Sequence, residues 1–310
     1  MALYLNLTEN EIQNIADRYN LKVISYSLIE QGSASNYLIN TNHGKYILTI
    51  SEIEPSRVQN MINVSFLLEK HDFPAPRIQR LANGEILTEY QGRVVWIKPY
   101  ITGRVITELD QNQISQVGAA MGRLHELPMP DNLPDQHFHV RKTYPTLMQE
   151  EFDQTYKSWL EQRYRYLRQN MPSGLPVGLI HGDLFADNIL FENGHFKAIL
   201  DFEDPVQSYK VFDLGMAAAG LCGDATKIAY NKVSALVNGY QQVRLLEENE
   251  KESLKLFIEY SALLTSMWRF WKCHIDPLDP KKANKYLAMV NMAKDAGAIP
   301  NALFMNTVFA

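Results

Sequence analysis

The chain has 310 residues, of which 46% are hydrophobic, and it carries a formal net charge of -5 at pH 7. This length can bury a sizeable core and favours about two domains, at roughly 150 residues each. Nucleic-acid binding usually needs a clustered basic face, so the mild acidity predicts no nucleic-acid partner. The ordinary glycine and proline contents exclude a fibrous chain.

The first part of the chain predicts strands and two helices. A helix should begin near Thr8, because Thr8 and Glu11 match the S/T-x-x-E capping box. A second helix is predicted over residues 55–71, where apolar residues recur near helical spacing. Runs of β-forming residues bounded by turn residues predict an antiparallel meander and two further strands, at residues 23–29, 37–39, 46–50, 85–90 and 94–98.

After residue 99 the sequence becomes mostly helical. Residues 99–103 have the composition of a connector, and one apolar stripe predicts a helix over residues 111–126. Strand-rich sequence followed by helix-rich sequence is typical of the α+β class. We therefore predict two lobes, a sheet-rich N-terminal lobe over residues 1–98 and a larger helix-rich lobe over residues 99–310.

Cysteine content and hydropathy predict a protein of a reducing compartment. Cys222 and Cys273 stand in apolar surroundings and form no C-x-x-C pair, so we expect two buried thiols and no zinc site. The N-terminus lacks the apolar core of a signal peptide, and the apolar run 214–222 is far too short to span a bilayer. We expect a cytoplasmic protein without a membrane partner.

The most informative segment begins at His181 and reads H-G-D-L-F-A-D-N. It matches the H-x-D-x-x-x-x-N catalytic loop of kinases, with Asp183 and Asn188 at the required spacing. Two short apolar strands follow, joined by the strong hairpin signal Asn193-Gly194, and Asp201 comes directly after the second strand. The hairpin should bring Asn188 and Asp201 close together, so that both could hold Mg²⁺ through hard oxygen ligands.

This arrangement predicts phosphoryl transfer from ATP to a hydroxyl. A hydroxyl is a poor nucleophile, and a carboxylate can orient it and accept its proton, which is the role we assign to Asp183. We expect His181 to orient the loop through hydrogen bonds rather than to take part in the chemistry. The competing interpretation is a hairpin whose Asp and Asn side chains merely cap turns.

At these residues the chain resembles the aminoglycoside-phosphotransferase and choline-kinase superfamily, in which H-G-D replaces the H-R-D of protein kinases. The stretch 118–125, which ends in Leu-His, is similar to a helix of that superfamily, and Phe212-Asp213-Leu-Gly is similar to its later D-L-[GA] turn. The resemblance covers about residues 20–275. It implies a bilobal protein-kinase-like fold, ATP and Mg²⁺ as cofactors, and a small-molecule hydroxyl acceptor.

Within the superfamily, three segments resemble type II homoserine kinases: residues 46–50, 71–76 and 268–271. Glu203-Asp204-Pro205 is instead more like general sugar or amino-alcohol kinases. Homoserine is thus the first acceptor to consider, and choline or ethanolamine, an aminoglycoside and methylthioribose are alternatives. A pseudokinase-like ATP-binding regulator is a further one. The missing A-P-E segment argues against a protein kinase.

We predict nucleotide contacts from three groups of residues. Small residues between the first two strands let backbone N–H groups approach phosphates, the connector would present the adenine edge, and apolar residues would wall the base. The absence of a G-x-x-x-x-G-K-[ST] motif excludes a P-loop enzyme. The predicted contacts are Gly32, Ser33, Ser35, Ile47, Pro99, Tyr100, Ile101 and Leu190.

The lysine that binds the α- and β-phosphates in protein kinases is missing at its usual place. That lysine follows a V-A-I pattern on the third strand, where this chain has Thr49. The nearby cations are Lys45, Arg57 and Lys98. Lys98 borders the connector and is expected to be a solvated charge at a strand end, so the cation that neutralises the phosphates stays unassigned.

The acceptor should bind beside Asp183 and the aromatic stretch 260–274. Arg269 could hold an acceptor carboxylate bidentately, or it could be a surface charge. Trp268 and Trp271 could line the acceptor site, with Tyr260 completing an aromatic box for a choline-like cation, or they could be helix core. The oligomeric state is left open.

Overall fold

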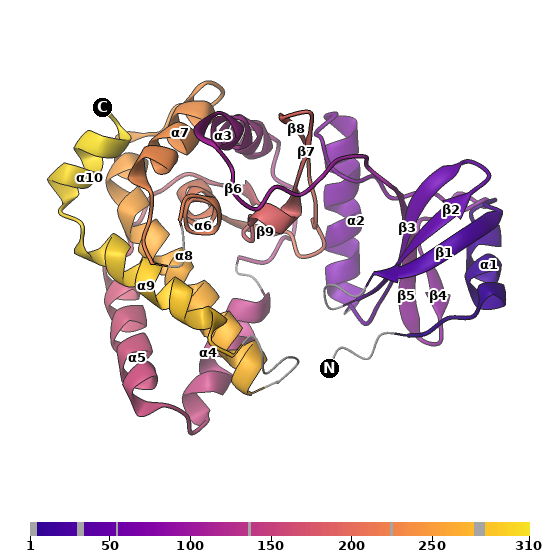
Figure 1. Cartoon of the computed structure of the whole chain (residues 1–310), viewed down its shortest axis with the longest axis horizontal. Coiled ribbons are helices and arrows are strands. Elements are labelled where there is room, and N and C mark those ends of the chain that lie inside the picture. Colours follow the sequence, from indigo (N-terminus) through magenta and orange to yellow (C-terminus); the bar gives the residue numbers. More distant parts are fainter. Residues whose placement is uncertain (1–4, 30–33, 54, 136–137, 224–225, 276–282) are drawn as a thin grey trace. The chain divides into compact units, whose positions relative to one another are not determined.

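The computed structural model describes residues 5–29, 34–53, 55–135, 138–223, 226–275 and 283–310. The chain forms two compact units (Figure 1). The first unit comprises Met1–Gly103 and Ala198–Glu203, and the second comprises Arg104–Lys197 and Asp204–Ala310. The first carries a five-stranded sheet and the second is mainly helical, which confirms the predicted α+β class.

The first unit is built on an antiparallel sheet with the strand order β1-β2-β3-β5-β4. The predicted meander is confirmed, and the short edge strand β4 is reached only after helix α2. The bounds of these elements are α1 Glu9–Asp17, β1 Val23–Ile29, β2 Ser35–Thr41, β3 Gly44–Ser51, α2 Pro55–Lys70, β4 Thr88–Tyr90 and β5 Arg93–Pro99.

Helix α1 covers one face of this sheet. Its capping box forms as predicted, because the Thr8 side chain accepts from the Glu11 amide and the Glu11 carboxylate accepts from the Thr8 amide. Ile12 and Ile15 of α1 lie in one core with alternate residues of the central strands. The opposite face carries the intervening residues, and there Met61 of α2 packs against Trp96 of β5.

The predicted strand 85–90 is too long. The structure has a strand only at Thr88–Tyr90, because the residues before it form a turn. The Leu81 amide donates to the Glu85 carbonyl, and the Asn83 side chain accepts from the Glu85 amide. Asn83-Gly84 thus has the side-chain and backbone chemistry of a turn, with Gly84 at a φ of 87°.

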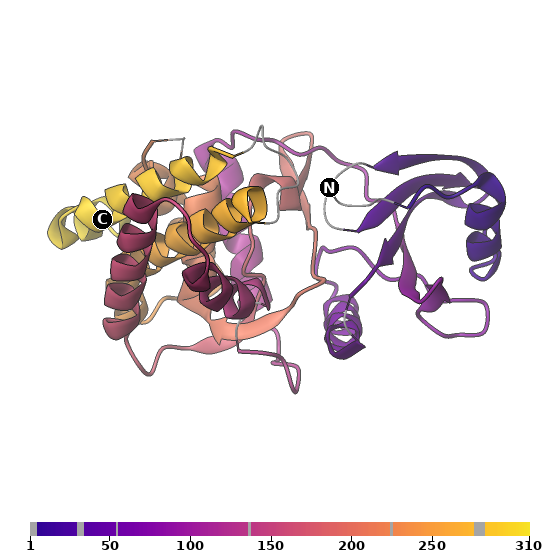
Figure 2. The same cartoon turned by 90° about the horizontal axis from the view of Figure 1, so that it is seen from below.

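The second unit consists of helices around two short strand pairs, β6 with β9 and β7 with β8. The long helix α8 packs against α6 and α9 (Figures 1 and 2). The helix bounds are α3 Gln111–His125, α4 Phe138–Gln149, α5 Gln154–Gln169, α6 Lys210–Leu221, α7 Tyr230–Gln241, α8 Glu248–His274, α9 Lys285–Ala298 and α10 Asn301–Val308. The strands are β6 Val177–Ile180, β7 Ile189–Glu192, β8 His195–Ile199 and β9 Val206–Tyr209.

Helices α3 and α7 approach so closely that each needs a glycine at the crossing. A Cβ atom on Gly118 would lie 2.1 Å from the Leu236 carbonyl oxygen, and one on Gly239 would lie 1.9 Å from the Ser115 carbonyl oxygen. No real Cβ tolerates such distances from backbone. This close packing brings the C-terminal end of α3 next to that of α7, where His125 contacts the Tyr240 hydroxyl.

The predicted turn at Phe212-Asp213-Leu-Gly is wrong. These residues lie in the first half of α6, and Phe212, Asp213 and Leu214 are all buried. The run is apolar on nearly every side, which is typical of a helix enclosed by other elements rather than of a surface turn.

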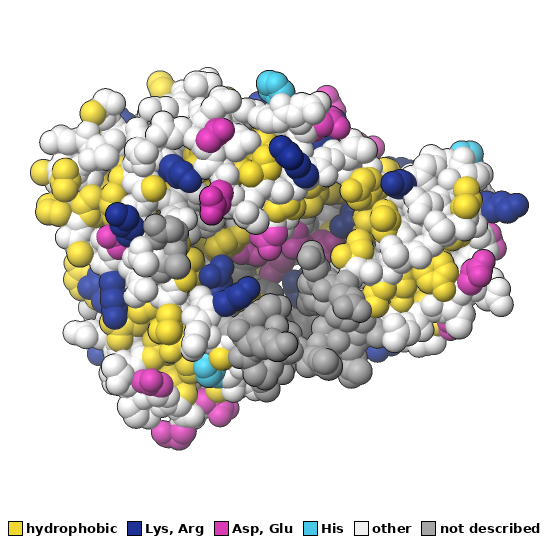
Figure 3. Space-filling model, viewed as in Figure 1, with side chains coloured by type: hydrophobic (Ala, Val, Ile, Leu, Met, Phe, Trp, Pro, Cys, Tyr) yellow, Lys and Arg dark blue, Asp and Glu magenta, His cyan; other side chains and the backbone are white. Residues whose placement is uncertain are grey.

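Figure 3 shows lysine and arginine side chains scattered among polar and apolar surface on the face drawn there. Within the described part of the chain, no helix is both long enough and apolar enough to cross a membrane.

Candidate functional site

The loop that carries Asp183 follows β6 and exposes this side chain between two buried neighbours, Gly182 and Leu184. The loop is held by its own hydrogen bonds. The Asp183 amide donates to Nδ1 of His181 at 3.3 Å, as expected of a histidine that orients the loop. The Asn188 side-chain nitrogen donates to the Asp183 carbonyl at 2.8 Å. An exposed carboxylate on a fixed backbone is well suited to meet an incoming hydroxyl.

A buried carboxylate anchors the base of this loop. Asp213 in α6 is fully buried, and its two oxygens accept from the amides of His181 at 2.9 Å and Gly182 at 2.6 Å. Nε2 of His125 lies 3.1 Å from Asp213 Oδ2. Burial alone would raise the pKa of Asp213, but the hydrogen bond from His125 and the partners at His181 bring that pKa below its ordinary value. Asp213 therefore stays a carboxylate that accepts from the loop.

The anchor continues as a chain of polar contacts through three helices. Tyr240 of α7 contacts Nδ1 of His125 through its hydroxyl at 2.7 Å, and Arg244 donates to the same hydroxyl at 3.0 Å. Arg244 also forms a bidentate pair with the fully buried Glu250 of α8, at 3.0 and 2.9 Å. Because the Asp213 carboxylate can only accept, Nε2 of His125 carries the hydrogen that points to it.

The hairpin after the loop has the predicted turn. Asn193 and Gly194 both have positive φ, at 52° and 80°, as a two-residue type I′ hairpin requires. Gln116 of α3 fixes this hairpin, because it accepts from the Phe196 amide at 2.8 Å and donates to the Gly194 carbonyl at 3.3 Å. Asn188 is the last residue of the short 3-10 turn Ala186–Asn188 and directly precedes β7 of this hairpin.

Asp201 belongs to the first unit and has a left-handed backbone, with φ at 62°. This conformation is uncommon for a residue with a side chain, and such residues cluster at functional sites. No group of three or more His, Cys, Asp or Glu side chains suited to a metal occurs among the residues described. An ion that arrives with a nucleotide needs fewer protein ligands, because phosphate oxygens complete its shell. The Asp201 carboxylate offers the hard oxygen atoms that Mg²⁺ prefers, and its use as a metal ligand together with Asn188 stays a prediction.

The structure describes six of the eight residues that are predicted to contact the nucleotide. Gly32 and Ser33 lie outside the described residues. The Ser35 side chain is buried, and its hydroxyl oxygen accepts from the Leu5 amide at 2.9 Å. Ile47 is half-buried on the face opposite α1, and Leu190 is buried in β7.

The connector already uses one of its backbone donors. The Tyr100 amide donates to the Lys45 carbonyl at 2.9 Å and so extends the pairing of β3 with β5. Pro99 has no N–H group. Among the three connector residues predicted to contact adenine, Ile101 is therefore the one that could donate from its backbone.

Lys98 is not the solvated charge expected from the sequence. Its Nζ atom lies 2.7 Å from Glu203 Oε1, and the two side chains are only 17% and 28% exposed. Both residues line a small cavity in the first unit together with Asp201. Thr49, in the place of the missing lysine, is fully buried and donates to Asn36 Oδ1 at 2.8 Å. The sequence did not predict the contacts of Glu203 and Asn36, because their partners lie 105 and 13 positions away in the chain.

Arg269 lies close to the catalytic loop. Its guanidinium carbon is 5.4 Å from the centre of the Phe185 ring, and the side chain is half-buried. Burial lowers the pKa of Arg269, and the negative charges of Asp183 and Asp187 act in the opposite direction. The helix therefore brings the predicted carboxylate-binding cation to the loop that carries the predicted base.

The two tryptophans of α8 stack on one another, with ring centres 5.4 Å apart. Nζ of Lys272 lies 5.5 Å from the Trp268 ring centre and 5.7 Å from that of Trp271. A lysine of the chain thus already occupies the cation position over both rings. Tyr260, the third member of the supposed aromatic box, is buried next to Phe212 instead.

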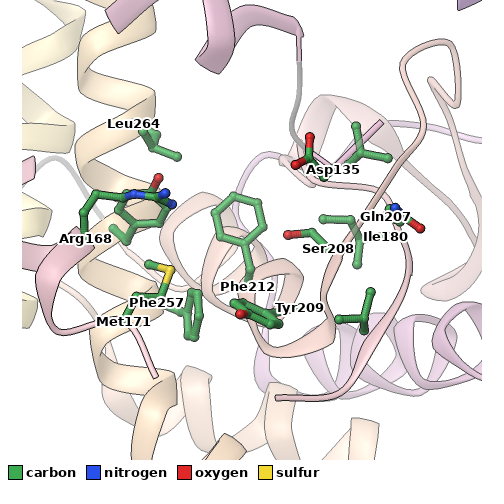
Figure 4. Close-up of a pocket in the computed structure, with 13 residues that line it drawn as sticks. Asp135, Arg168, Met171, Ile180, Gln207, Ser208, Tyr209, Phe212, Phe257 and Leu264 are labelled. Carbon is green, nitrogen blue, oxygen red and sulfur yellow. The ribbon is translucent and has the colours of Figure 1, made fainter. Parts of the chain in front are cut away.

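The second unit also encloses a cavity of about 370 Å³ between β6, β9, α5, α6 and α8 (Figure 4). Its walls are mainly aromatic and aliphatic, and Arg168 and Asp135 lie at different parts of its lining. Asp183, Trp268 and Arg269 are not among the residues that line it. Of the residues predicted to contact the acceptor, this cavity therefore includes Tyr260 but not the catalytic loop or Arg269.

Comparisons with known proteins agree with this geometry. Residues 25–246 match the phosphotransferase enzyme family. A homoserine kinase from Agrobacterium fabrum (strain C58 / ATCC 33970) is 28% identical over 283 residues, which cover 87% of this chain and 88% of that protein. A solved amicoumacin kinase, in complex with AMP-PNP, Ca²⁺ and Ami, has a TM-score of 0.75 at 14% identity and covers 96% of this chain and 97% of its own. A microcompartment-associated aminopropanol kinase has a TM-score of 0.71 at 16% identity, with coverage of 98% and 99%. The chain therefore belongs to the phosphotransferase enzyme family and is a small-molecule kinase with the aminoglycoside-phosphotransferase type of fold.

Proposed function

We propose that this kinase uses Mg·ATP to phosphorylate the hydroxyl of homoserine. The single observation that carries the choice of acceptor is the half-buried Arg269 beside the Asp183 loop. An amino-acid alcohol has a carboxylate, and the planar guanidinium fork binds carboxylates bidentately. Eight relatives that are 24 to 28% identical bear the name homoserine kinase, which supports the same choice.

The proposed reaction follows from the roles of three residues. Asp183 accepts a hydrogen bond from the acceptor hydroxyl, orients its oxygen in line with the γ-phosphorus, and takes up the proton as the new O–P bond forms. The bond between the γ-phosphorus and its bridging oxygen breaks, and ADP leaves with that electron pair. Mg²⁺ held by Asn188 and Asp201 would neutralise the phosphate charge. The AMP-PNP and Ca²⁺ in the amicoumacin kinase structure support the use of a nucleotide and a divalent ion.

The other acceptors are less well matched to the residues near the loop. A choline-like cation would compete with Lys272 for the faces of Trp268 and Trp271. An aminoglycoside carries several positive charges, which Arg269 would repel. A neutral sugar such as methylthioribose would leave the half-buried guanidinium without an anionic partner from the substrate.

A pair of acceptors that differ only in the carboxylate tests this proposal. The wild-type enzyme should prefer L-homoserine over 3-amino-1-propanol, which has the same hydroxyl and amine but no carboxylate. Loss of a charged bidentate contact is worth roughly 10- to 100-fold in kcat/KM. Arg269→Ala should abolish this preference and leave the KM for ATP unchanged. Arg269→Lys, which keeps the charge but not the fork, should lie between the two.

The matched control is Lys272→Ala, which removes a cation three residues further along α8. It should leave the ratio of the two acceptors within about twofold, because Lys272 lies over the tryptophan rings. Equal use of both acceptors by the wild-type enzyme would remove Arg269 from the acceptor site. Activity on a choline or sugar acceptor alone would reject homoserine.

A further inference from the structure

At the position of the usual phosphate-binding lysine, the chain has Thr49, which is hydrogen-bonded to Asn36. Thr49 of β3 is fully buried and donates to Asn36 of β2, which lies directly opposite in the sheet. This contact satisfies the hydroxyl and leaves no positive charge there. If the enzyme neutralises the ATP phosphates with a side chain of the first unit, the cation must come from another position.

Lys98 lies on the same face of the sheet and one strand away. Thr49 pairs with Trp96 and Ile47 pairs with Lys98, so Thr49 and Lys98 are diagonal neighbours. Such residues have Cα atoms about 7–8 Å apart, within reach of a long side chain. The alternate strand residues Leu48 and Ile97 belong to the core under α1, which puts Lys98 and Thr49 together on the opposite face. The flexible lysine stem can thus carry its ammonium towards the place that a lysine at position 49 would serve.

The ammonium of Lys98 is held by a carboxylate next to the predicted metal ligand. Glu203 accepts from Lys98 at 2.7 Å and is two residues after Asp201. Asp201, Lys98 and Glu203 line one small cavity. Helix α2 contributes Ser65 and apolar residues to this cavity, and no acidic residue. The ion pair that protein kinases form between the third strand and a helix is thus replaced here by a pair between β5 and the segment after Asp201.

We propose that Lys98 binds the phosphates of ATP in place of the missing strand lysine, and that Glu203 positions its ammonium. The inference rests on the proposed use of ATP. An ammonium has three donors, so one can contact Glu203 while the others contact phosphate oxygens. Because Glu203 follows Asp201 so closely, the same pair ties the phosphate-binding cation to the metal-binding segment.

The candidate Lys45 offers a matched control. It lies on the same sheet face as Thr49 but is exposed at the beginning of β3. Lys45→Met and Lys98→Met make the same chemical change at two positions of one sheet face. Binding is measured by calorimetry without any acceptor, for Mg·ATP, Mg·ADP and adenosine, so the identity of the acceptor does not affect the result.

Lys98→Met should weaken Mg·ATP and Mg·ADP binding roughly 10- to 100-fold and change adenosine binding by less than about twofold. Lys98→Arg should recover part of the loss, and Lys45→Met should bind all three ligands as the wild type does. Glu203→Gln keeps the cation but not its charged partner, so it should weaken Mg·ATP binding less than Lys98→Met does. It also provides a second test should Lys98→Met fail to fold.

Four results would overturn the assignment of Lys98, and the first three concern the variants. The first is Mg·ATP binding by Lys98→Met that equals that of the wild type. The second is an equal loss of adenosine and Mg·ATP binding in Lys98→Met, which would indicate a structural role. The third is a loss of Mg·ATP binding in Lys45→Met as large as that in Lys98→Met. The fourth is wild-type protein that binds Mg·ATP no more tightly than adenosine. Wild-type protein that binds Mg·ATP normally but phosphorylates no homoserine would reject the proposed acceptor and leave the Lys98 result standing.

Discussion

The buried polar chain behind the catalytic loop allows a quantitative prediction for Tyr240→Phe. This change removes one hydroxyl and keeps the ring, so it leaves the apolar packing of α7 in place. The hydroxyl contacts Nδ1 of His125 at 2.7 Å and accepts from Arg244 at 3.0 Å. His125 is 1% exposed, so no water replaces the lost donor. Arg244 keeps its two contacts with Glu250. One unsatisfied buried group costs about 1–3 kcal/mol, and we expect the free energy of unfolding to fall by that amount.

Removal of the Tyr240 hydroxyl should also weaken the contacts that hold the catalytic loop. His125 without its donor is less firmly fixed against Asp213, whose oxygens hold the amides of His181 and Gly182. We expect kcat to decrease by less than the roughly 100-fold loss of a general base, with the KM for ATP unchanged.

Thermal unfolding and steady-state kinetics measure both effects of Tyr240→Phe. A loss of 1–3 kcal/mol corresponds to a decrease in Tm of about 2–10 °C for a unit of this size. The matched control is Tyr166→Phe, because Tyr166 is 49% exposed. The control should change stability by no more than about 0.5 kcal/mol and leave kcat unchanged. Equal effects of the two substitutions, or an unchanged Tm in Tyr240→Phe, would refute the role assigned to the chain of contacts.

Four further predictions concern single side chains. Asp183→Asn should lower kcat by about 100-fold or more while ATP binding stays nearly intact, and near-normal turnover would remove Asp183 as the base. Asp201→Ala should weaken Mg·ATP binding and abolish turnover, and metal-dependent nucleotide binding equal to that of the wild type would contradict this. Asp213 has a pKa below its ordinary value of 3.8 in the folded protein, so its stabilising contribution is present above about pH 4 and is lost as the pH falls through the folded value. The difference in unfolding free energy between wild type and Asp213→Asn should therefore shrink as the pH falls below about 4, whereas a difference that does not change between about pH 5 and 2 would argue against a charged Asp213. Burial raises the pKa of Cys222 to about 12, so iodoacetamide at pH 8 should spare Cys222 in the folded enzyme, and mass spectrometry of its rapid alkylation would show that it is accessible.

Local signals were the most successful part of the sequence analysis. The capping box at Thr8 and the turn at Asn193-Gly194 both form, because a few neighbouring residues determine them. The H-x-D-x-x-x-x-N spacing likewise identified the loop before its surroundings were known. Cys222 is buried as predicted, while Cys273 is only half-buried.

The contacts that hold the site together could not be read from spacing. Lys98 and Glu203 are 105 positions apart, and His125 and Asp213 are 88 apart. Such pairs depend on how the strands and helices pack, which local patterns do not encode. His125 ends the Leu-His segment, and Asp213 lies in the D-L-[GA] segment. A buried histidine and a buried aspartate each need a polar partner, which is the signal in the sequence that could have suggested their contact.

Several expectations stay predictions. They are the cytoplasmic location, the absence of a nucleic-acid partner, the boundary of the lobes at residue 98 and the individual nucleotide contacts. The oligomeric state stays open.

³¹P NMR of the wild-type enzyme with Mg·ATP and L-homoserine tests whether homoserine is the phosphoryl acceptor. We predict that the γ-phosphate signal of ATP decreases while signals of ADP and of a new phosphate monoester, O-phosphohomoserine, increase in equal amounts. Homoserine would be rejected as the acceptor if it produced no phosphomonoester while another alcohol from a panel of amino alcohols, sugars and aminoglycosides did.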